Sequence, residues 1–232
     1  MTHCIQNLTT KNPCRKIVQS QESTLSQHQV PEPWSGNIEQ APILFISSNP
    51  SISDSEEYPT LSWSDSEMSD FFNNRFGGGR KAWAEGGRKS LQRDGTYSRV
   101  IPFWNGVRHL AKELLLREPV PGNDYAITEI VHCKSLEEIG VKQAQEQCVR
   151  LYLRKVLDIA AARVVVVLGE PAKHAICKEF DLPETPSLVE QIQLGNSEII
   201  FTFLPHPNAY KVRTFAKCLT THQLESLQMF LA

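Results

Sequence analysis

The sequence has no long apolar run and little excess of charge of either sign. None of its apolar runs approaches the roughly 18 residues that a membrane-spanning helix needs. The polar start MTHCIQNLTTKNPCRK has no apolar centre of the kind found in signal peptides. With a formal net charge of only -2, the totals show no extended basic surface for nucleic acid, although a local one stays open. We therefore expect a soluble, cytoplasmic protein.

Two common catalytic signatures are also missing. The chain contains no GxxxxGK[ST] loop for nucleotide phosphates and no serine or cysteine triad. It does have 232 residues, 41% of them hydrophobic and 22% charged, which is enough for a sizeable core. This composition excludes a disordered or fibrous protein and predicts a single domain over residues 1–232.

Four short apolar runs rich in β-branched residues alternate with helical patterns. The runs cover residues 42–47, 125–131, 163–168 and 198–204, and the helical patterns cover 104–117, 141–160, 171–180 and 214–230. Each run is continuously apolar, which is typical of strands that helices cover on both faces. The pattern predicts an α/β fold, a three-layer α/β/α sandwich with a central four-stranded parallel sheet.

Two segments fall outside this pattern. An N-terminal arm (1–40) carries two cysteines and a polar, proline-bearing stretch, and an insertion covers about residues 52–100. The insertion contains SDFFNNRFGGGRKAWAEGGRKSLQRDGTYSR, in which glycines and basic residues lie among aromatics. One interpretation is a solvated, mobile surface loop. The other is an insertion that follows DNA phosphates and offers rings for stacking on bases.

Polar residues that suit catalysis follow the predicted strands. Asn49 follows the first run, Glu129 lies in the second and His206 follows the fourth. Because ligands of such folds bind at the carboxyl ends of the strands, we expect these side chains to meet at one edge of the sheet. Taken singly, they have structural explanations: a turn cap, a solvated carboxylate and a backbone hydrogen bond. Together they suit a dissociative reaction in which the protein positions water and stabilises charge.

The same segments resemble motifs of the uracil-DNA glycosylase superfamily. SSNPS (47–51) is similar to the first motif, in the asparagine form of the mismatch-specific and single-strand-selective branches, and LPHPNA (204–209) to the second. VIPFWNGVRHLAKELL, YAITEIVHCKS and RVVVVLGEPAKHAI resemble segments of the iron-sulfur family 4 enzymes. The resemblance covers about residues 41–230 apart from the insertion, and it implies the same α/β/α fold.

This resemblance implies hydrolysis of the bond between a base and deoxyribose, after the nucleotide has been flipped out of the DNA. By resemblance, Asn49 positions or activates the water, His206 hydrogen-bonds the departing base and Phe103 stacks on it. Side chains expected to contact DNA are Ser51, Asn208, Tyr210, Lys211 and Arg213, although the last three can equally begin a final helix with a solvated face. DNA is the expected partner, and we expect a monomer.

Glu129 departs from the family 4 pattern, in which an asparagine at this position reads uracil. An ionised carboxylate only accepts hydrogen bonds, and it is a natural partner for the exocyclic amine of cytosine. We therefore expect a base of the cytosine type; a protonated Glu129, or one that points elsewhere, leaves uracil open. Together with the insertion, this favours excision of a modified cytosine, such as the glucosylated hydroxymethylcytosine that superfamily members in phage defence remove.

The six cysteines are expected to be thiols or metal ligands, because disulfides are rare in a reducing cytoplasm. The family 4 resemblance implies a structural [4Fe-4S] cluster, with zinc as the alternative. Its ligands would be Cys4, Cys14, Cys133 and Cys148, although nine residues separate Cys4 from Cys14 where the family pattern has two. Four unrelated buried thiols are the other explanation. Cys177 and Cys218 match no family position and are expected in the core.

Three other functions compete with excision of a modified cytosine. The first is a uracil-DNA glycosylase of base excision repair, and the second is a non-catalytic module that binds modified DNA on the same fold. The third, a metal-dependent nucleotide hydrolase, is disfavoured because the strand ends offer no clustered carboxylates for magnesium.

Overall fold

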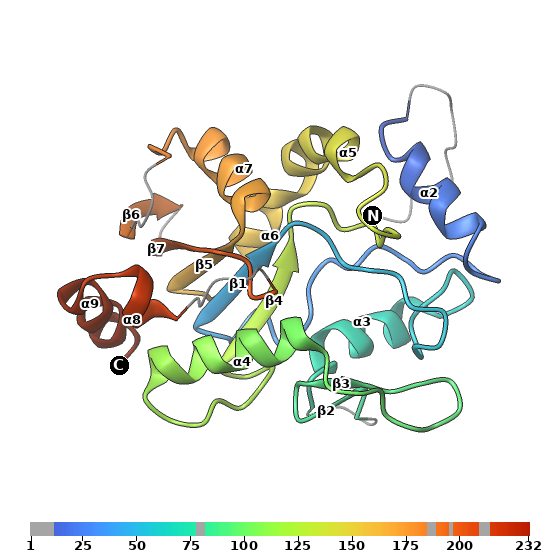
Figure 1. The fold of residues 1–232 in the computed structure, drawn as a ribbon, viewed down its shortest axis with the longest axis horizontal. Coiled ribbons are helices and arrows are strands. Elements are labelled where there is room, and N and C mark those ends of the chain that lie inside the picture. The colour runs from blue at the N-terminus through green and yellow to red at the C-terminus, as the bar shows by residue number, and fades with distance from the viewer. Residues whose placement is uncertain (1–11, 78–81, 185–188, 195–196, 209–213) are drawn as a thin grey trace.

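The computed structural model describes residues 12–77, 82–184, 189–194, 197–208 and 214–232. Its centre is a sheet with helices on both faces (Figure 1). In spatial order its strands are β4 (Tyr125–Glu129), β1 (Ile43–Ser47), β5 (Val164–Leu168), β7 (Ser197–Leu204) and β6 (Val189–Leu194). The first four pair in parallel and coincide with the four predicted runs, which confirms the predicted α/β class.

The fifth strand, β6, was not predicted. It pairs antiparallel with β7 at the edge of the sheet, so the sheet has five strands where the sequence predicted four. Its sequence VEQIQL contains as many polar as apolar residues, unlike the continuous apolar runs of the other strands. A mixed sequence suits an antiparallel edge strand, but it has neither a continuous apolar run nor a regular alternation that would reveal β6.

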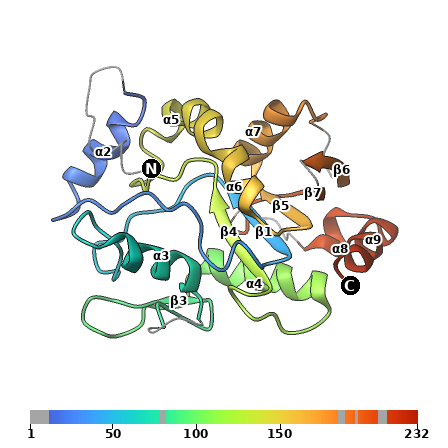
Figure 2. The ribbon, with the colours of Figure 1, turned by 180° about the vertical axis from the view of Figure 1, so that it is seen from behind.

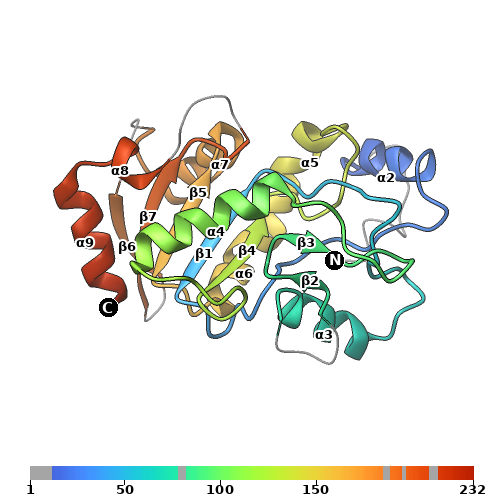
Figure 3. The ribbon, with the colours of Figure 1, turned by 60° about the horizontal axis from the view of Figure 1, so that its bottom comes forward.

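Two apolar clusters, one on each face of the sheet, form most of the core. Leu44, Ile46, Val165 and Val167 face one cluster, whereas Ile43, Phe45, Val164 and Val166 face the other. Alternate residues of each strand thus enter opposite clusters, which explains why the runs are apolar throughout. The first cluster packs against α5 (Val141–Cys148), α6 (Arg154–Ile159) and α7 (Glu170–Phe180). The second packs against α4 (Pro102–Leu115), α8 (Phe215–Cys218) and α9 (Thr221–Leu231), with α4 crossing the sheet in Figure 3.

Two predicted helices are interrupted. The helix predicted over 141–160 consists of α5, a π-helical turn (Val149–Leu153) and α6, and the last helix is divided into α8 and α9. Thr220 begins α9 with a capping box, in which its hydroxyl accepts from the Gln223 amide. No helix in the described ranges is both long and apolar enough to cross a membrane.

The insertion is folded in its described part and is not a surface loop. It contains α3 (Asp65–Asn74) and a short hairpin of β2 (Ala84–Glu85) and β3 (Lys89–Ser90), which lie beside the sheet near the N-terminal end of α4 (Figure 1). Tyr58, Phe71 and Phe72 are buried together in a third apolar cluster. These three rings pack inside the protein and are not available to stack on DNA bases, whereas Tyr97 of the insertion is exposed.

The described part of the N-terminal arm packs against the body of the protein. Its helix α2 (Arg15–Glu22) buries Ile17 in the first core cluster and is visible beside α5 in Figure 2. A Cβ atom on Gly140 would lie 2.7 Å from Lys16 Cβ and 2.8 Å from Ile17 N, so only glycine permits this close approach. Gln21 Nε2 also donates to Lys134 O at 2.8 Å. These contacts join the described part of the arm to the body of the protein.

Candidate active site

A cavity of about 500 Å³ opens at the carboxyl edge of the parallel strands. The register brings these strand ends level, because Ser47 pairs with Glu129 and Leu168 pairs with Leu204. Six of the predicted site residues border this one cavity: Asn49, Ser51, Phe103, Glu129, His206 and Asn208. The expectation that the residues after the strands meet at one edge is therefore confirmed.

Asn49 lies on a turn that main-chain hydrogen bonds hold in place. The amide of Val131 donates to Ser48 O at 2.9 Å, and the amide of Ser135 donates to Pro50 O at 3.1 Å. The side chain of Asn49 is half-buried, and its Nδ2 donates to Pro50 O at 3.1 Å. A carboxamide can accept a hydrogen bond through its oxygen as well as donate, so Asn49 has the chemistry needed to orient a water molecule.

His206 and Phe103 lie against each other. Their rings are nearly parallel, with an angle of 12° and centroids 5.3 Å apart. His206 Nδ1 accepts a hydrogen bond from the Asn208 amide at 3.2 Å, so a neutral imidazole carries its proton on Nε2. Gly169 has a φ of +88°, and a Cβ there would lie 3.2 Å from His206 Cβ. This glycine lets the second motif lie close to the end of β5.

Glu129 is buried, with 4% of its surface exposed, so the explanation of a solvated carboxylate is wrong. Within the described part of the chain, its Oε2 meets no hydrogen-bond partner. Burial raises the pKa of Glu129 well above its ordinary value, and the neighbouring negative charge of Glu32 raises it further, against the opposing effect of Arg75 and Lys134. Burial therefore favours the neutral form of the Glu129 carboxyl group.

This direction favours the protonated alternative for Glu129 over the expected ionised carboxylate. A neutral carboxyl group donates through its hydroxyl and accepts through its carbonyl oxygen. That pair of groups can match N3 and the exocyclic amine of cytosine, and it can equally match the N3–H group and O4 of uracil. Glu129 by itself therefore does not select cytosine over uracil.

A network of buried charges lies beside Glu129, and the sequence did not indicate it. Arg75 pairs with Glu32 and with Glu56, each at 2.5 Å, and Lys134 pairs with Glu56 at 3.0 Å. Burial opposes ionisation of both glutamates, but the two cations outweigh it and hold the pKa of Glu32 and of Glu56 below the ordinary value. Two cations thus balance two carboxylates, whereas no described cation forms an ion pair with Glu129.

The insertion supplies half of this network, through Glu56 and Arg75. The Arg75 guanidinium also lies 4.9 Å from the ring centroid of Trp104 and 5.1 Å from that of Phe71.

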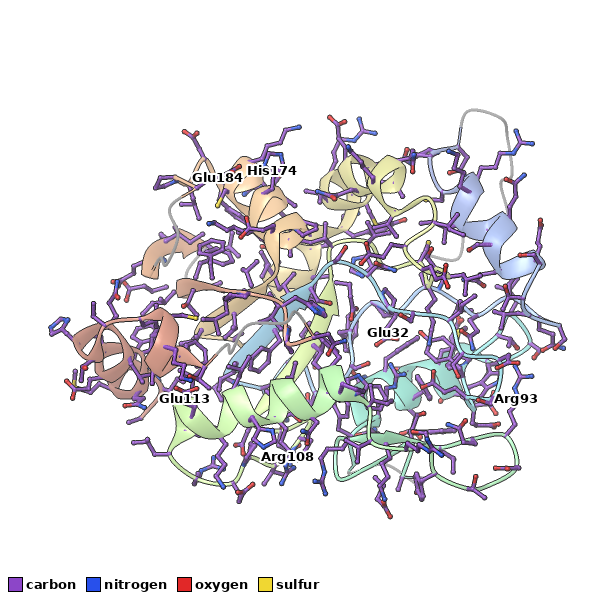
Figure 4. The ribbon with its side chains drawn as sticks, viewed as in Figure 1. Glu32, Arg93, Arg108, Glu113, His174 and Glu184 are labelled. Carbon is purple, nitrogen blue, oxygen red and sulfur yellow. The ribbon has the colours of Figure 1, made fainter. Side chains whose placement is uncertain are left out.

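Figure 4 shows Glu32 toward the middle of the molecule, whereas Arg93 of the insertion lies at its outer edge. The spacing of Phe71, Phe72, Arg75 and Phe76 places them on one helical face, and this was the sequence signal that could have revealed a buried arginine.

Four of the predicted functional residues lie outside the described ranges: Cys4, Tyr210, Lys211 and Arg213. The two remaining residues predicted to contact DNA, Ser51 and Asn208, are exposed at the mouth of the cavity. They are placed where a bound strand could reach them.

The three described cysteines of the predicted metal site belong to one buried cluster. Cys14 immediately precedes α2, Cys133 follows β4 and Cys148 ends α5, and each is at most 5% exposed. Among the described residues, no group of three or more His, Cys, Asp or Glu side chains is arranged to hold a metal ion. Since Cys4 is not described, the four-cysteine site stays a prediction. Cys177 lies in the first core cluster, as predicted, whereas Cys218 is only partly buried and packs against the second.

Comparison with known proteins agrees with this geometry. No curated protein matches the chain. The profile of the "Uracil DNA glycosylase superfamily" matches residues 33–228, a range that includes every described residue of the cavity except Glu32. The chain therefore belongs to the uracil DNA glycosylase superfamily, whose members are DNA glycosylases.

Proposed function

We propose that this protein is a monofunctional DNA glycosylase that removes a modified cytosine and leaves an abasic site. The observation that carries the proposal is the single cavity bordered by Asn49, Glu129 and His206. Asn49 orients the attacking water, and the Nε2–H group of His206 donates to the base as negative charge develops on it. Phe103 provides an apolar contact for the extracted base.

The size and lining of the cavity support a base that carries a polar substituent. A volume of about 500 Å³ lies within the range of roughly 300–1,000 Å³ typical of ligand cavities, and it exceeds the needs of one pyrimidine ring. The insertion lines one wall with small hydroxyl and amide side chains: Ser53, Ser55, Ser90, Gln92 and Ser98. Such groups can hydrogen-bond the hydroxyls of a hydroxymethyl or glucosyl substituent. Because these modified cytosines occur in phage DNA, we propose a role in antiviral defence.

The neutral state of Glu129 also favours a second candidate function. Its donor and acceptor match uracil as well as cytosine, so a uracil-DNA glycosylase of base repair uses the same contacts. The two candidates differ in the insertion wall, whose hydroxyl groups have no role in holding unmodified uracil.

Mass spectrometry of the bases released from a panel of DNAs separates these functions. The panel contains uracil, cytosine, hydroxymethylcytosine and its glucosylated forms, in single and double strands. We expect release of a modified cytosine, and release of uracil alone would establish the second candidate. Binding of modified DNA with no release would identify a non-catalytic module, and it would contradict both enzymatic functions.

We also propose a structural [4Fe-4S] cluster held by Cys4, Cys14, Cys133 and Cys148, with zinc as the alternative. The shared burial of the last three supports it, since they come from three separate segments of the chain. A bound cluster would supply a crosslink between the arm and the sheet, with no part in the reaction. Protein purified without oxygen is expected to be brown and to contain iron; bound zinc in a colourless protein would establish the alternative.

A further inference from the structure

We propose that Glu129 is a catalytic residue that donates a proton to ring nitrogen N3 of a cytosine held in the cavity. This inference rests on the proposed excision of a modified cytosine and specifies how its base becomes able to leave. Cytosine is a poor leaving group as an anion, so that its departure needs a proton in addition to a hydrogen bond. Groups at C5 of the ring, where the modifications are attached, do not obstruct N3.

The structure places one acidic residue, Glu129, in the lining of the cavity at the end of a strand. Glu129 is the last residue of β4, and it pairs in register with Ser47, two residues before Asn49. The residue belongs to the lining of the cavity, although only 4% of its surface is exposed. Its Oε2 has no hydrogen-bond partner in the described part of the protein, whereas the carboxylates of Glu32 and Glu56 are paired with cations. Glu129 is thus a buried carboxyl group beside this cavity that forms no ion pair in the described part of the protein and can serve as the acid.

Charged and titratable groups from three other segments surround Glu129. Glu32, from the chain before β1, holds it in the neutral form, whereas Arg75 at the end of α3 and Lys134 after β4 favour ionisation. Tyr58, from the insertion, donates its hydroxyl to Glu32 at 3.2 Å. Once the proton has moved to the base, the two cations stabilise the new carboxylate on Glu129. The site therefore favours the neutral carboxyl group of Glu129 before the proton transfer and stabilises its carboxylate afterwards.

The step balances in atoms and charge. The Glu129 hydroxyl gives its proton to N3, which produces a carboxylate and a cationic cytosine. The bond between N1 and C1′ then breaks, its electron pair goes to N1, and the base leaves neutral while C1′ becomes cationic. Water that Asn49 orients adds to C1′ and loses a proton to solvent, and Glu129 takes up a proton from solvent. The net reaction is hydrolysis, with Glu129 restored.

Glu129→Gln tests the proposal with little change of shape. The glutamine keeps one donor and one acceptor, so it preserves the hydrogen bonds to the base, but it cannot transfer a proton. We expect single-turnover release of the modified cytosine to fall about 100-fold or more, the usual contribution of general acid catalysis, with DNA binding changed little. Glu39→Gln, at an exposed position in the turn before β1, is the matched control and should retain the wild-type rate.

The pH profile and the substrate supply further readouts. The wild-type rate should fall as rising pH ionises Glu129, and Glu129→Gln should lose that dependence. Wild-type protein should also fail to release an analogue of the modified cytosine in which a carbon atom replaces N3. Wild-type rates for Glu129→Gln, or for the carbon analogue, would overturn the proposal while leaving the glycosylase function intact. If the wild-type protein releases no base from any DNA of the panel, the proposed function fails together with this inference.

Discussion

The two walls of the cavity are built differently. The wall at the sheet edge consists of side chains on turns after strands, and Asn49 and His206 on it are only partly buried. The opposite wall includes Glu56 and Arg75 of the insertion, whose charges are fully engaged in ion pairs inside the protein. The accessible polar groups are suited to meet water and a departing base, whereas the paired charges maintain the shape and potential around Glu129. Substitutions on the two walls should therefore change different properties.

The largest effect is expected at the sheet-edge wall. Asn49→Ala removes the group that orients water, so base release should fall by up to about 10⁴-fold, while the free energy of unfolding and the affinity for DNA change little. Asn123→Ala, exposed in the turn before β4, is the matched control. Single-turnover assays beside binding titrations measure both properties. An active Asn49→Ala would show that another group positions the water.

A comparable effect, but on stability, is expected at the insertion wall. Arg75→Met leaves two buried carboxylates with only Lys134 as a cation, so the free energy of unfolding should fall by about 3–5 kcal/mol. The ion pair between Arg117 and Asp124 is far more exposed, so Arg117→Met should change stability little. Urea unfolding compares the two variants. Equal effects would mean that the buried network does not stabilise the fold.

A smaller effect is expected for Phe103, which belongs to the sheet-edge wall through its contact with His206. Phe103→Ala should weaken binding of substrate DNA by about 1–3 kcal/mol, the usual contribution of one aromatic ring stacked on a base. Phe103→Tyr keeps the ring and should bind nearly as wild type. Titrations with DNA that contains the substrate base distinguish the two variants, and equal affinities would remove Phe103 from the base contact.

The smallest effect is a trend of stability with pH. The pKa of Glu129 is higher in the folded protein than its ordinary value of about 4.3 in the unfolded chain. The folded state thus binds the extra proton, so this residue favours folding most at low pH and loses that contribution as pH rises through its folded pKa. The stability of Glu129→Gln relative to wild type should therefore increase with pH. A difference that stays constant from acid to neutral pH would mean that folding does not raise the pKa of Glu129.

The sheet-edge wall could be predicted from the sequence, because each part of it follows a continuous apolar run. Asn49 and His206 were found in this way, since parallel strands bring their carboxyl ends to one edge. The insertion wall could not be predicted, because its ion pairs join residues far apart in sequence: Arg75 and Glu32 are separated by 43 positions, and Lys134 and Glu56 by 78. Isolated charges of this kind are normally exposed.

The charge state of Glu129 also could not be predicted from the sequence. Its place at the end of a strand was evident from the sequence, but its proton depends on Glu32, Arg75 and Lys134, which only the fold brings near. Strand β6 was missed for a different reason: its sequence is half polar and has no regular apolar pattern, and only its pairing with β7 makes it part of the sheet.

The network around Glu32, Glu56, Arg75 and Lys134 also determines when the cavity can form as the chain folds. Its contacts span large sequence separations, and contacts of this kind form slowly because long loops must close first. During synthesis, the insertion wall cannot be complete before Lys134 has emerged, and the second motif with His206 follows still later. A chain that has not yet been made as far as His206 therefore has no finished cavity.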